Sequence, residues 1–289
     1  MSRLFTFGCS FTNYAWPTWA DFLGLEFDYF ENWGVPGIGN VAIANRVAEC
    51  FVKNNITNED TVIIQWTSHI RHDYHLFKEE TDRDAANGWK TKGSIFGYTN
   101  LELYDKKWLD TFFDENSYIM LSLNAIYSTL ELVKSKKCNW KMTSIGEFEK
   151  LGTDFTINPG GYGEINSLTS DSLWDHELFL PYKKVWNEPN WLEPIGCYTW
   201  KNKEELYTWD VGESKKTWTD PHPSPNLGID WLYNVVKPSL NMPNNKLTLK
   251  QIEWLEICRE ARTNIPDLQM FGDVLEFELD AYDKRYRGY

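Results

Sequence analysis

The sequence has little of three things that mark common classes of protein: excess positive charge, paired cysteines and long apolar runs. Its 289 residues carry 29 lysines and arginines against 42 aspartates and glutamates, which gives a formal net charge of -13. Proteins that bind nucleic acid neutralise its phosphates with clustered basic residues. No basic stripe of that kind is present, so we expect no nucleic-acid partner.

The cysteines are too few and too far apart to build a disulfide scaffold or a zinc site. There are five, an odd number, and no two of them form a Cys-x-x-Cys pair. A disulfide scaffold or a zinc knuckle needs regularly spaced cysteines. Neither is predicted, and a reducing place of synthesis fits this pattern best.

Apolar runs of membrane-spanning length are also missing. No run approaches the roughly 20 residues that a transmembrane helix needs, so no membrane partner is expected. The chain enters strand-like sequence at residue 3, without the basic start, apolar stretch and cleavage site of a secretory signal. We expect a soluble protein that is synthesised in the cytoplasm without a signal peptide.

What the chain has in quantity is core-forming sequence: 42% of its residues are hydrophobic, and 15 are tryptophans. This is ample for one large domain. We predict a domain over 1–240 that includes an irregular Trp-rich insertion over 146–217, followed by a C-terminal helical extension and tail over 241–289. The tryptophans are assigned to packing, with stacking on sugar rings as the alternative.

Strand-like and helical patterns alternate along the chain, which indicates a mostly parallel sheet between two layers of helices. The expected fold is therefore a three-layer α/β/α domain. Strands are predicted over 3–7, 25–30, 61–66 and 139–144. Helices are predicted over 16–23, 41–52, 108–136, 226–236 and 248–262.

Loops that follow parallel strands converge on one edge of the sheet, where ligands bind in such folds. Three of these loops carry suggestive residues. They are Gly8-Cys9-Ser10 after the first strand, the glycine-rich turn at 34–40 after the second, and Thr67-Ser68-His69 after the third. Each loop also has a purely structural explanation. Ser10 could cap a helix, the turn at 34–40 could be an ordinary tight turn, and residues 67–69 could cap the edge of the core.

A fourth feature lies far along the chain. Asp220-Pro221-His222-Pro223 holds an acid and an imidazole in a stiff turn, so that one group could orient the other. Alone, this sequence is usually only a turn. Its combination with a serine after the first strand is the arrangement that a serine nucleophile needs.

The joint pattern resembles the SGNH, or GDSL-like, hydrolase superfamily over residues 3–70 and about 215–236. The resemblance implies a flavodoxin-like fold of the SGNH hydrolase type. It also implies Ser10 as nucleophile, His222 as its base and Asp220 as the acid. The amides of Ser10 and Gly37 would bind the oxyanion, with Gly39 as an alternative to Gly37.

The motifs depart from the family pattern at three places. Cys9 stands where an aspartate usually precedes the nucleophile. Ser68 stands at the position of the oxyanion asparagine, where its hydroxyl is the expected donor in place of the amide. Loss of one good oxyanion donor can cost roughly 10²–10³ in rate. The family acid often lies three residues before the histidine, where this chain has Thr219. Such degenerate variants are similar to phage-encoded members, so a virion or host-surface setting stays open.

The resemblance implies a serine esterase that acts on an acyl ester, with O-acetyl groups of a carbohydrate as the suggested substrate and no metal or organic cofactor. The alternative is a noncatalytic SGNH-like module for glycan binding, or for a structural role in a phage particle or other assembly. The acidic and aromatic end at 277–289 could be a docking arm in such an assembly or a frayed terminus.

A metal site is the competing reading of three histidines. His69, His72 and His75 lie three residues apart, a spacing at which helical neighbours share a face. No further residue completes a recognisable set of ligands. Solvated or capping histidines are favoured, and no metal site is predicted.

Overall fold

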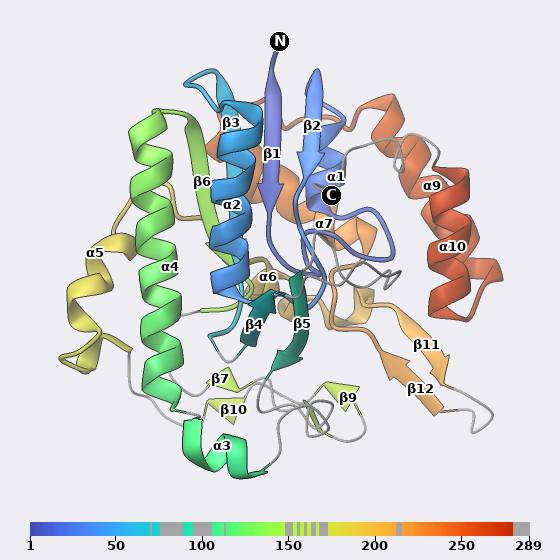
Figure 1. Cartoon of the computed structure of the whole chain (residues 1–289). Helices are drawn as coiled ribbons and strands as arrows, with labels where there is room; N and C mark the ends of the chain where they lie inside the picture. The colour runs from blue at the N-terminus through green and yellow to red at the C-terminus, as the bar shows by residue number, and fades with distance from the viewer. Residues whose placement is uncertain are drawn as a thin grey trace.

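A computed structural model of the chain describes residues 1–69, 71–75, 89–94, 106–112, 114–147, 173–211 and 216–279, together with four dipeptides between 153 and 167. Four parallel strands form the central sheet in the order β2-β1-β3-β6 (Figure 1). They are β1 (Arg3–Phe7), β2 (Tyr29–Asn32), β3 (Asp60–Trp66) and β6 (Asn139–Ser144). This order, with the second strand outside the first and the third on its other side, is that of flavodoxin-like sheets. The predicted fold class is confirmed.

Helices cover both faces of the sheet. α2 (Asn40–Asn54) and α4 (Glu115–Lys136) pack together on one face, and α1 (Trp19–Gly24) and α7 (Pro225–Trp231) pack together on the other (Figure 1). β3 lies between these layers, and its Val62, Ile63 and Ile64 are all 0% exposed. A strand buried on both faces needs such a continuous apolar run.

The remaining elements flank this framework. Two C-terminal helices, α9 (Leu249–Asn264) and α10 (Leu268–Glu278), contribute Trp254 and Phe271 to the same core as the sheet. The shorter elements are β4 (Arg71–His75), β5 (Trp89–Ser94), α3 (Lys106–Phe112), α5 (Lys183–Trp186), α6 (Ile195–Lys201), β11 (Thr208–Val211), β12 (Lys216–Thr219), a π-helical turn (Leu232–Val236) and α8 (Lys237–Ser239).

Three predicted elements have the wrong bounds, and the first is the helix predicted over 16–23, which begins only at Trp19. The strand predicted over 25–30 begins only at Tyr29, because the chain before it continues the last turn of α1: the Leu25 N–H donates to the Asp21 carbonyl and the Glu26 N–H to the Leu23 carbonyl. The helix predicted over 108–136 is two helices. The second begins after Asp114, whose carboxylate accepts the Ser117 N–H at 3.0 Å and so caps α4.

The described part of the predicted insertion packs against the sheet. Residues 190–196 run along β6: the Met142 N–H donates to the Asn190 carbonyl at 3.0 Å, and the Leu192 N–H donates to the Met142 carbonyl at 2.8 Å. Val185, Ile195 and Trp209 belong to the main core. The segment is therefore built onto the α/β framework rather than folded around a core of its own.

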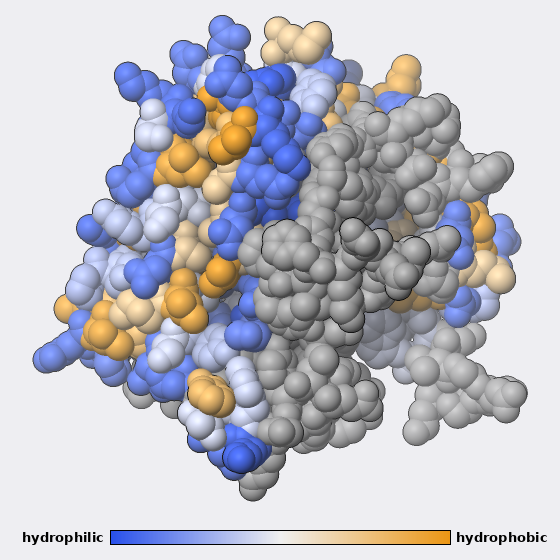
Figure 2. Space-filling view, in the orientation of Figure 1, coloured by the Kyte–Doolittle hydropathy of each residue, from blue (hydrophilic) through white to orange (hydrophobic). Residues whose placement is uncertain are grey.

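The described surface over α2 and α4 is mostly hydrophilic with scattered apolar side chains (Figure 2). Val52 and Leu121 are exposed there, at 84% and 51%. Single exposed apolar residues are normal on a folded protein. Within the described ranges, no helix is long and apolar enough to cross a membrane.

A partly buried ion pair ties the start of β1 to β3. The Arg3 Nε and Nη2 atoms each lie 2.6 Å from an oxygen of Asp60, and the Thr57 N–H donates to the same carboxylate at 2.7 Å. Burial raises the pKa of Asp60, but the bonds from Arg3 and Thr57 outweigh burial and hold the pKa below its usual value. Such a group contributes stability above its unfolded pKa and loses that contribution as the pH falls through its folded pKa.

Asp60→Asn should therefore lower the free energy of unfolding by about 2 kcal/mol at pH 7. The Arg3 side chain is 26% exposed, which keeps the effect below that of a fully buried pair. The difference from wild type should shrink at about pH 3, where the wild-type carboxylate is also becoming protonated. Urea unfolding at both pH values measures it. Glu49→Gln, which breaks the exposed Glu49–Lys53 pair, is the control and should cost at most about 0.5 kcal/mol. A loss at Asp60→Asn that is the same at both pH values would contradict this account.

Candidate active site

Ser10 lies in a sharp turn directly after β1. The Cys9 carbonyl accepts the Thr12 N–H at 2.9 Å and the Asn13 N–H at 3.1 Å, so a single helical turn begins at Ser10. A Cβ atom at Gly8 would lie 2.1 Å from the Thr12 Oγ1 atom and 3.1 Å from the Gln65 Cβ atom. Only glycine fits at position 8, and this close approach lets the chain turn at the carboxyl end of β1.

A buried polar network holds this turn against the end of β2. The Asn32 Nδ2 atom donates to the Thr12 carbonyl at 2.8 Å, and the Asn13 Nδ2 atom donates to the Gly34 carbonyl at 2.8 Å. Thr18 is the N-cap residue of α1, and its hydroxyl donates to the Thr12 carbonyl at 2.6 Å. Because these groups are buried, their hydrogen bonds are costly to break, and the turn that carries Ser10 is held on three sides.

The second half of the site is the turn before α7. The Ser224 hydroxyl caps α7 by accepting the Leu227 N–H, and Pro225 occupies its first turn. Two residues earlier, the His222 N–H donates to the Asp220 Oδ1 atom at 3.0 Å, which closes the turn around the acid. The stiff turn predicted at 220–223 therefore directs the imidazole and the carboxylate toward each other.

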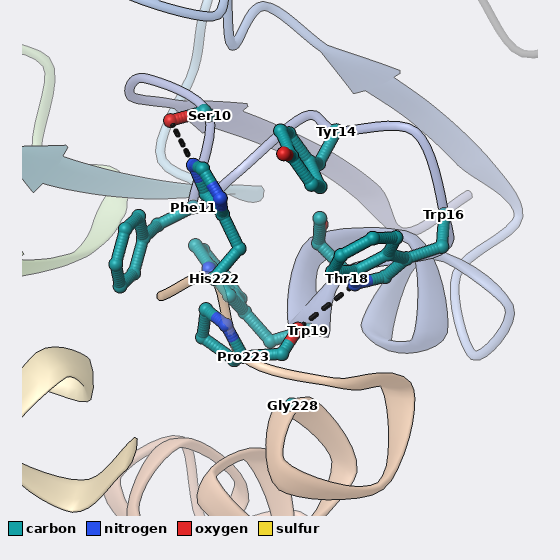
Figure 3. A pocket seen from close by; sticks show the side chains of 9 residues that line it. All are labelled: Ser10, Phe11, Tyr14, Trp16, Thr18, Trp19, His222, Pro223 and Gly228. Carbon is teal, nitrogen blue, oxygen red and sulfur yellow. Dashed lines mark hydrogen bonds between the residues drawn. The ribbon is translucent and has the colours of Figure 1, made fainter. Parts of the chain in front are cut away.

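The structure brings the three predicted catalytic residues together. The Ser10 Oγ atom lies 2.7 Å from His222 Nε2, and His222 Nδ1 lies 2.5 Å from Asp220 Oδ1 (Figure 3 shows the first contact). The expected serine–histidine distance of about 3.5 Å or less is confirmed. The acid next to His222 is Asp220, two residues before it, and not a residue at the family position of Thr219.

A neutral imidazole beside an ionised carboxylate has one tautomer that satisfies both contacts. An ionised carboxylate can only accept, so the Nδ1 atom of His222 carries the proton that it donates to Asp220. The Nε2 atom is then left as an acceptor for the Ser10 hydroxyl. This is the tautomer in which a histidine can take a proton from serine.

Asp220 is 0% exposed, and donors surround it. Its Oδ2 atom accepts the Tyr14 hydroxyl at 2.9 Å and the Trp209 Nε1–H at 3.3 Å. Its own N–H donates to the Tyr207 carbonyl at 2.8 Å. A buried carboxylate without partners is strongly unfavourable, and these contacts hold the Asp220 side chain in place. The sequence analysis did not find Tyr14 or Trp209 as parts of the site.

The imidazole lies between aromatic rings. The Tyr14 ring stacks on it, with centroids 3.8 Å apart, and the Phe11 ring lies 5.1 Å away at a tilt. His222 is 9% exposed and Ser10 is 7% exposed. A narrow recess behind them is lined by these residues with Trp16, Thr18, Trp19, Pro223 and Gly228 (Figure 3).

The predicted oxyanion amides come from two loops at the same edge of the sheet. Within the part of the chain that the structure describes, the Ser10 N–H has no acceptor. Gly37 is partly exposed and has a φ of 82°, a left-handed conformation that favours glycine. The Gly39 N–H donates to Asp73 Oδ1 at 2.7 Å. This bond engages the Gly39 amide, and Gly37 stays the predicted oxyanion glycine.

Ser68 follows a residue that is firmly held. The Asn40 side chain donates to the Thr67 carbonyl at 2.9 Å and accepts the Thr67 N–H at 2.8 Å, which joins the end of β3 to the start of α2. Ser68 itself is partly exposed. Its position next to this clamp places it at the same edge as Ser10, and its role as an oxyanion donor stays a prediction.

The histidines of the metal hypothesis have other surroundings. The His72 Nδ1 atom lies 2.9 Å from the Tyr118 hydroxyl oxygen, the Trp108 ring packs edge-on against the imidazole, and burial lowers the pKa of His72. The side chain of His75 and residues 280–289 of the predicted docking arm lie outside the described residues. Among the side chains that are described, no group of three or more His, Cys, Asp or Glu is placed to hold a metal ion.

The chain matches no protein-family model and no curated protein sequence. Among solved structures it is similar to a protein from Bacteroides fragilis NCTC 9343, provisionally designated an acylhydrolase, with 15% identity and a TM-score of 0.37 over 83% of this chain and 86% of that one. It is also similar to a member of the lipolytic protein G-D-S-L family from Veillonella parvula DSM 2008, with 9% identity and a TM-score of 0.35 over 76% of this chain and 91% of that one.

Both TM-scores are low, and the fold class follows from the sheet order of this chain itself. In that order, and in the grouping of Ser10, His222 and Asp220 at the carboxyl edge of the sheet, the chain resembles the SGNH, or GDSL-like, hydrolases.

Proposed function

We propose that the protein is a serine esterase that hydrolyses an acyl ester. The observation that carries this proposal is the continuous chain of contacts from Ser10 Oγ to His222 Nε2 at 2.7 Å and from His222 Nδ1 to Asp220 Oδ1 at 2.5 Å. A serine hydroxyl is a weak nucleophile until an adjacent base takes its proton, and a carboxylate on the far nitrogen keeps that base in the required tautomer.

In the proposed reaction the Ser10 Oγ atom attacks the ester carbonyl while His222 Nε2 takes the hydroxyl proton. The carbonyl oxygen becomes an oxyanion that the amides of Ser10 and Gly37 stabilise, with the Ser68 hydroxyl as a further donor. His222 then gives the proton to the leaving alcohol, and an acyl group remains on Ser10. Water attacks this acyl-enzyme with His222 again as the base, which releases the acid and restores Ser10. The steps require an ester and water alone.

Burial supports a catalytic rather than a merely structural role. If Ser10 were only a helix cap, its hydroxyl would accept a backbone N–H, but its contact is with the His222 ring. A rigid turn at Asp220-Pro221-His222 does not by itself need a buried carboxylate. Asp220 is 0% exposed, and removing a carboxylate from water is unfavourable. Buried titratable groups linked in this way are typical of functional sites.

For the substrate we propose an acetyl ester on a carbohydrate. The support is the aromatic content of residues 174–218, where Trp174, Trp186, Trp191 and Trp218 are each partly exposed. Tryptophan rings can stack on sugars. We also propose action at a host surface as part of a virion, on the likeness of the degenerate motifs to phage-encoded members of the superfamily.

Two assays on wild-type protein test the proposal. Turnover of p-nitrophenyl acetate and release of acetate from an O-acetylated polysaccharide are both expected, and both should be lost in Ser10→Ala. Turnover of the aryl ester without acetate release would keep the esterase and reject the carbohydrate substrate. No turnover of either, with glycan binding that is equal in wild type and Ser10→Ala, would reject the esterase in favour of the noncatalytic module.

A further inference from the structure

Tyr14 contacts both His222 and Asp220, the two residues that support Ser10. Its hydroxyl donates to Asp220 Oδ2 at 2.9 Å, on the oxygen that His222 does not use. Its ring stacks on the His222 imidazole, with the centroids 3.8 Å apart and the planes 20° from parallel (Figure 3). Because Tyr14 lies four residues after Ser10, the turn after β1 supplies both the serine and this support.

We propose, on the basis of the esterase function above, that Tyr14 is a positioning residue for the reaction. Its hydroxyl holds the Asp220 carboxylate in the plane of the imidazole, and its ring holds the imidazole in the orientation that directs Nε2 at Ser10. The longer contact from Trp209 Nε1, at 3.3 Å, is the second donor to the same oxygen. Asp220 is 0% exposed, so water does not replace a donor that is lost.

The ring has a second effect, which arises only during the reaction. When His222 takes the serine proton it becomes an imidazolium, and the face of an aromatic ring attracts a cation that lies over it. The stack at 3.8 Å places the Tyr14 ring in this position. Because the charge on His222 develops in the transition state, this contact lowers the barrier rather than tightening the binding of substrate.

Packing alone does not account for the tyrosine. The ring also meets the Trp16 ring edge-on at 4.5 Å, a contact that phenylalanine would make equally well. The hydroxyl is what joins Tyr14 to Asp220, so Tyr14→Phe separates the two effects. It keeps the stack on His222 and removes the donor to the carboxylate.

Tyr14→Phe should lower kcat on p-nitrophenyl acetate about tenfold with little change in KM, the loss expected for one hydrogen bond to a charged group. Tyr14→Leu, which also removes the ring, should lower kcat further. Tyr118→Phe is the matched control, because it removes a tyrosine hydroxyl that contacts a different histidine, His72, at 2.9 Å. It should leave kcat and KM unchanged.

A proton NMR measurement tests the same claim without turnover. The proton between His222 Nδ1 and Asp220 lies in a short bond to a carboxylate and should resonate far downfield. Its resonance should move in Tyr14→Phe and stay in place in Tyr118→Phe. A Tyr14→Phe protein with wild-type kcat and an unmoved resonance would overturn the proposal. A wild-type protein without turnover would reject the esterase, and the resonance alone would then decide whether Tyr14 holds Asp220 and His222.

Discussion

Ser10→Ala should lower kcat/KM on a short-chain aryl ester by roughly 10⁴ or more, because nucleophile, base and acid act as a unit and no other group substitutes for the serine oxygen. The Ser10 hydroxyl contacts His222 Nε2 at 2.7 Å and is 7% exposed. Its removal leaves the turn at 8–13 intact, since that turn is held by backbone groups and by Asn32. His222→Ala should lose activity to the same extent.

Steady-state kinetics with p-nitrophenyl acetate measure this loss, and urea unfolding shows whether the fold is retained. Ser239→Ala is the matched control: it removes a serine hydroxyl that donates to the Val236 carbonyl, in α8 and outside the site. It should keep wild-type activity. A Ser10→Ala protein that folds normally and retains more than about a tenth of the wild-type kcat/KM would show that Ser10 is not the nucleophile.

Asp220→Asn should lower kcat on the same ester by roughly 10³–10⁴, as expected when the wrong tautomer of the base is held in place. An asparagine can present its amide N–H to His222 Nδ1, which moves the ring proton to Nε2. The Nε2 atom then has no lone pair for the Ser10 hydroxyl. The geometry is kept and the acceptor is lost, so kcat should fall far more than KM rises.

Thr219→Val is the matched control for Asp220→Asn. Thr219 stands where members of the family often have their acid, but its side chain is exposed and Asp220 is the residue on His222. Thr219→Val should therefore leave kcat unchanged. If Asp220→Asn cost less than about tenfold, another carboxylate would be orienting His222 and the assignment of Asp220 would be wrong.

Three of the four strands of the central sheet could be predicted from local sequence. β1 and β6 have the predicted bounds, and β3 begins one residue earlier than predicted, since each is a short run that is buried on both faces. The start of β2 could not be predicted, because residues 25–27 have the composition of a strand while their N–H groups extend the last turn of α1. Local composition does not reveal which acceptor a backbone N–H will find.

The residues of the site likewise include some that the local sequence predicts and others that it does not. Ser10, Asp220 and His222 could be predicted because they lie in short motifs with a recognisable spacing. Tyr14 and Trp209 could not, because their contacts with Asp220 join residues that are 206 and 11 positions away from it and no local pattern marks them. The hydrogen bond that engages the Gly39 amide could not be predicted either, because its acceptor Asp73 lies 34 positions away.

Labelling with a fluorophosphonate tests the central claim most directly, because the reagent forms a bond to a serine oxygen only when that serine is activated, and it releases fluoride. Wild-type protein should be labelled on the peptide that contains Ser10, as identified by mass spectrometry, and Ser10→Ala should take no label. His222→Ala should be labelled far more slowly than wild type. A wild-type protein that takes no label, or takes it on a different serine, would contradict the account.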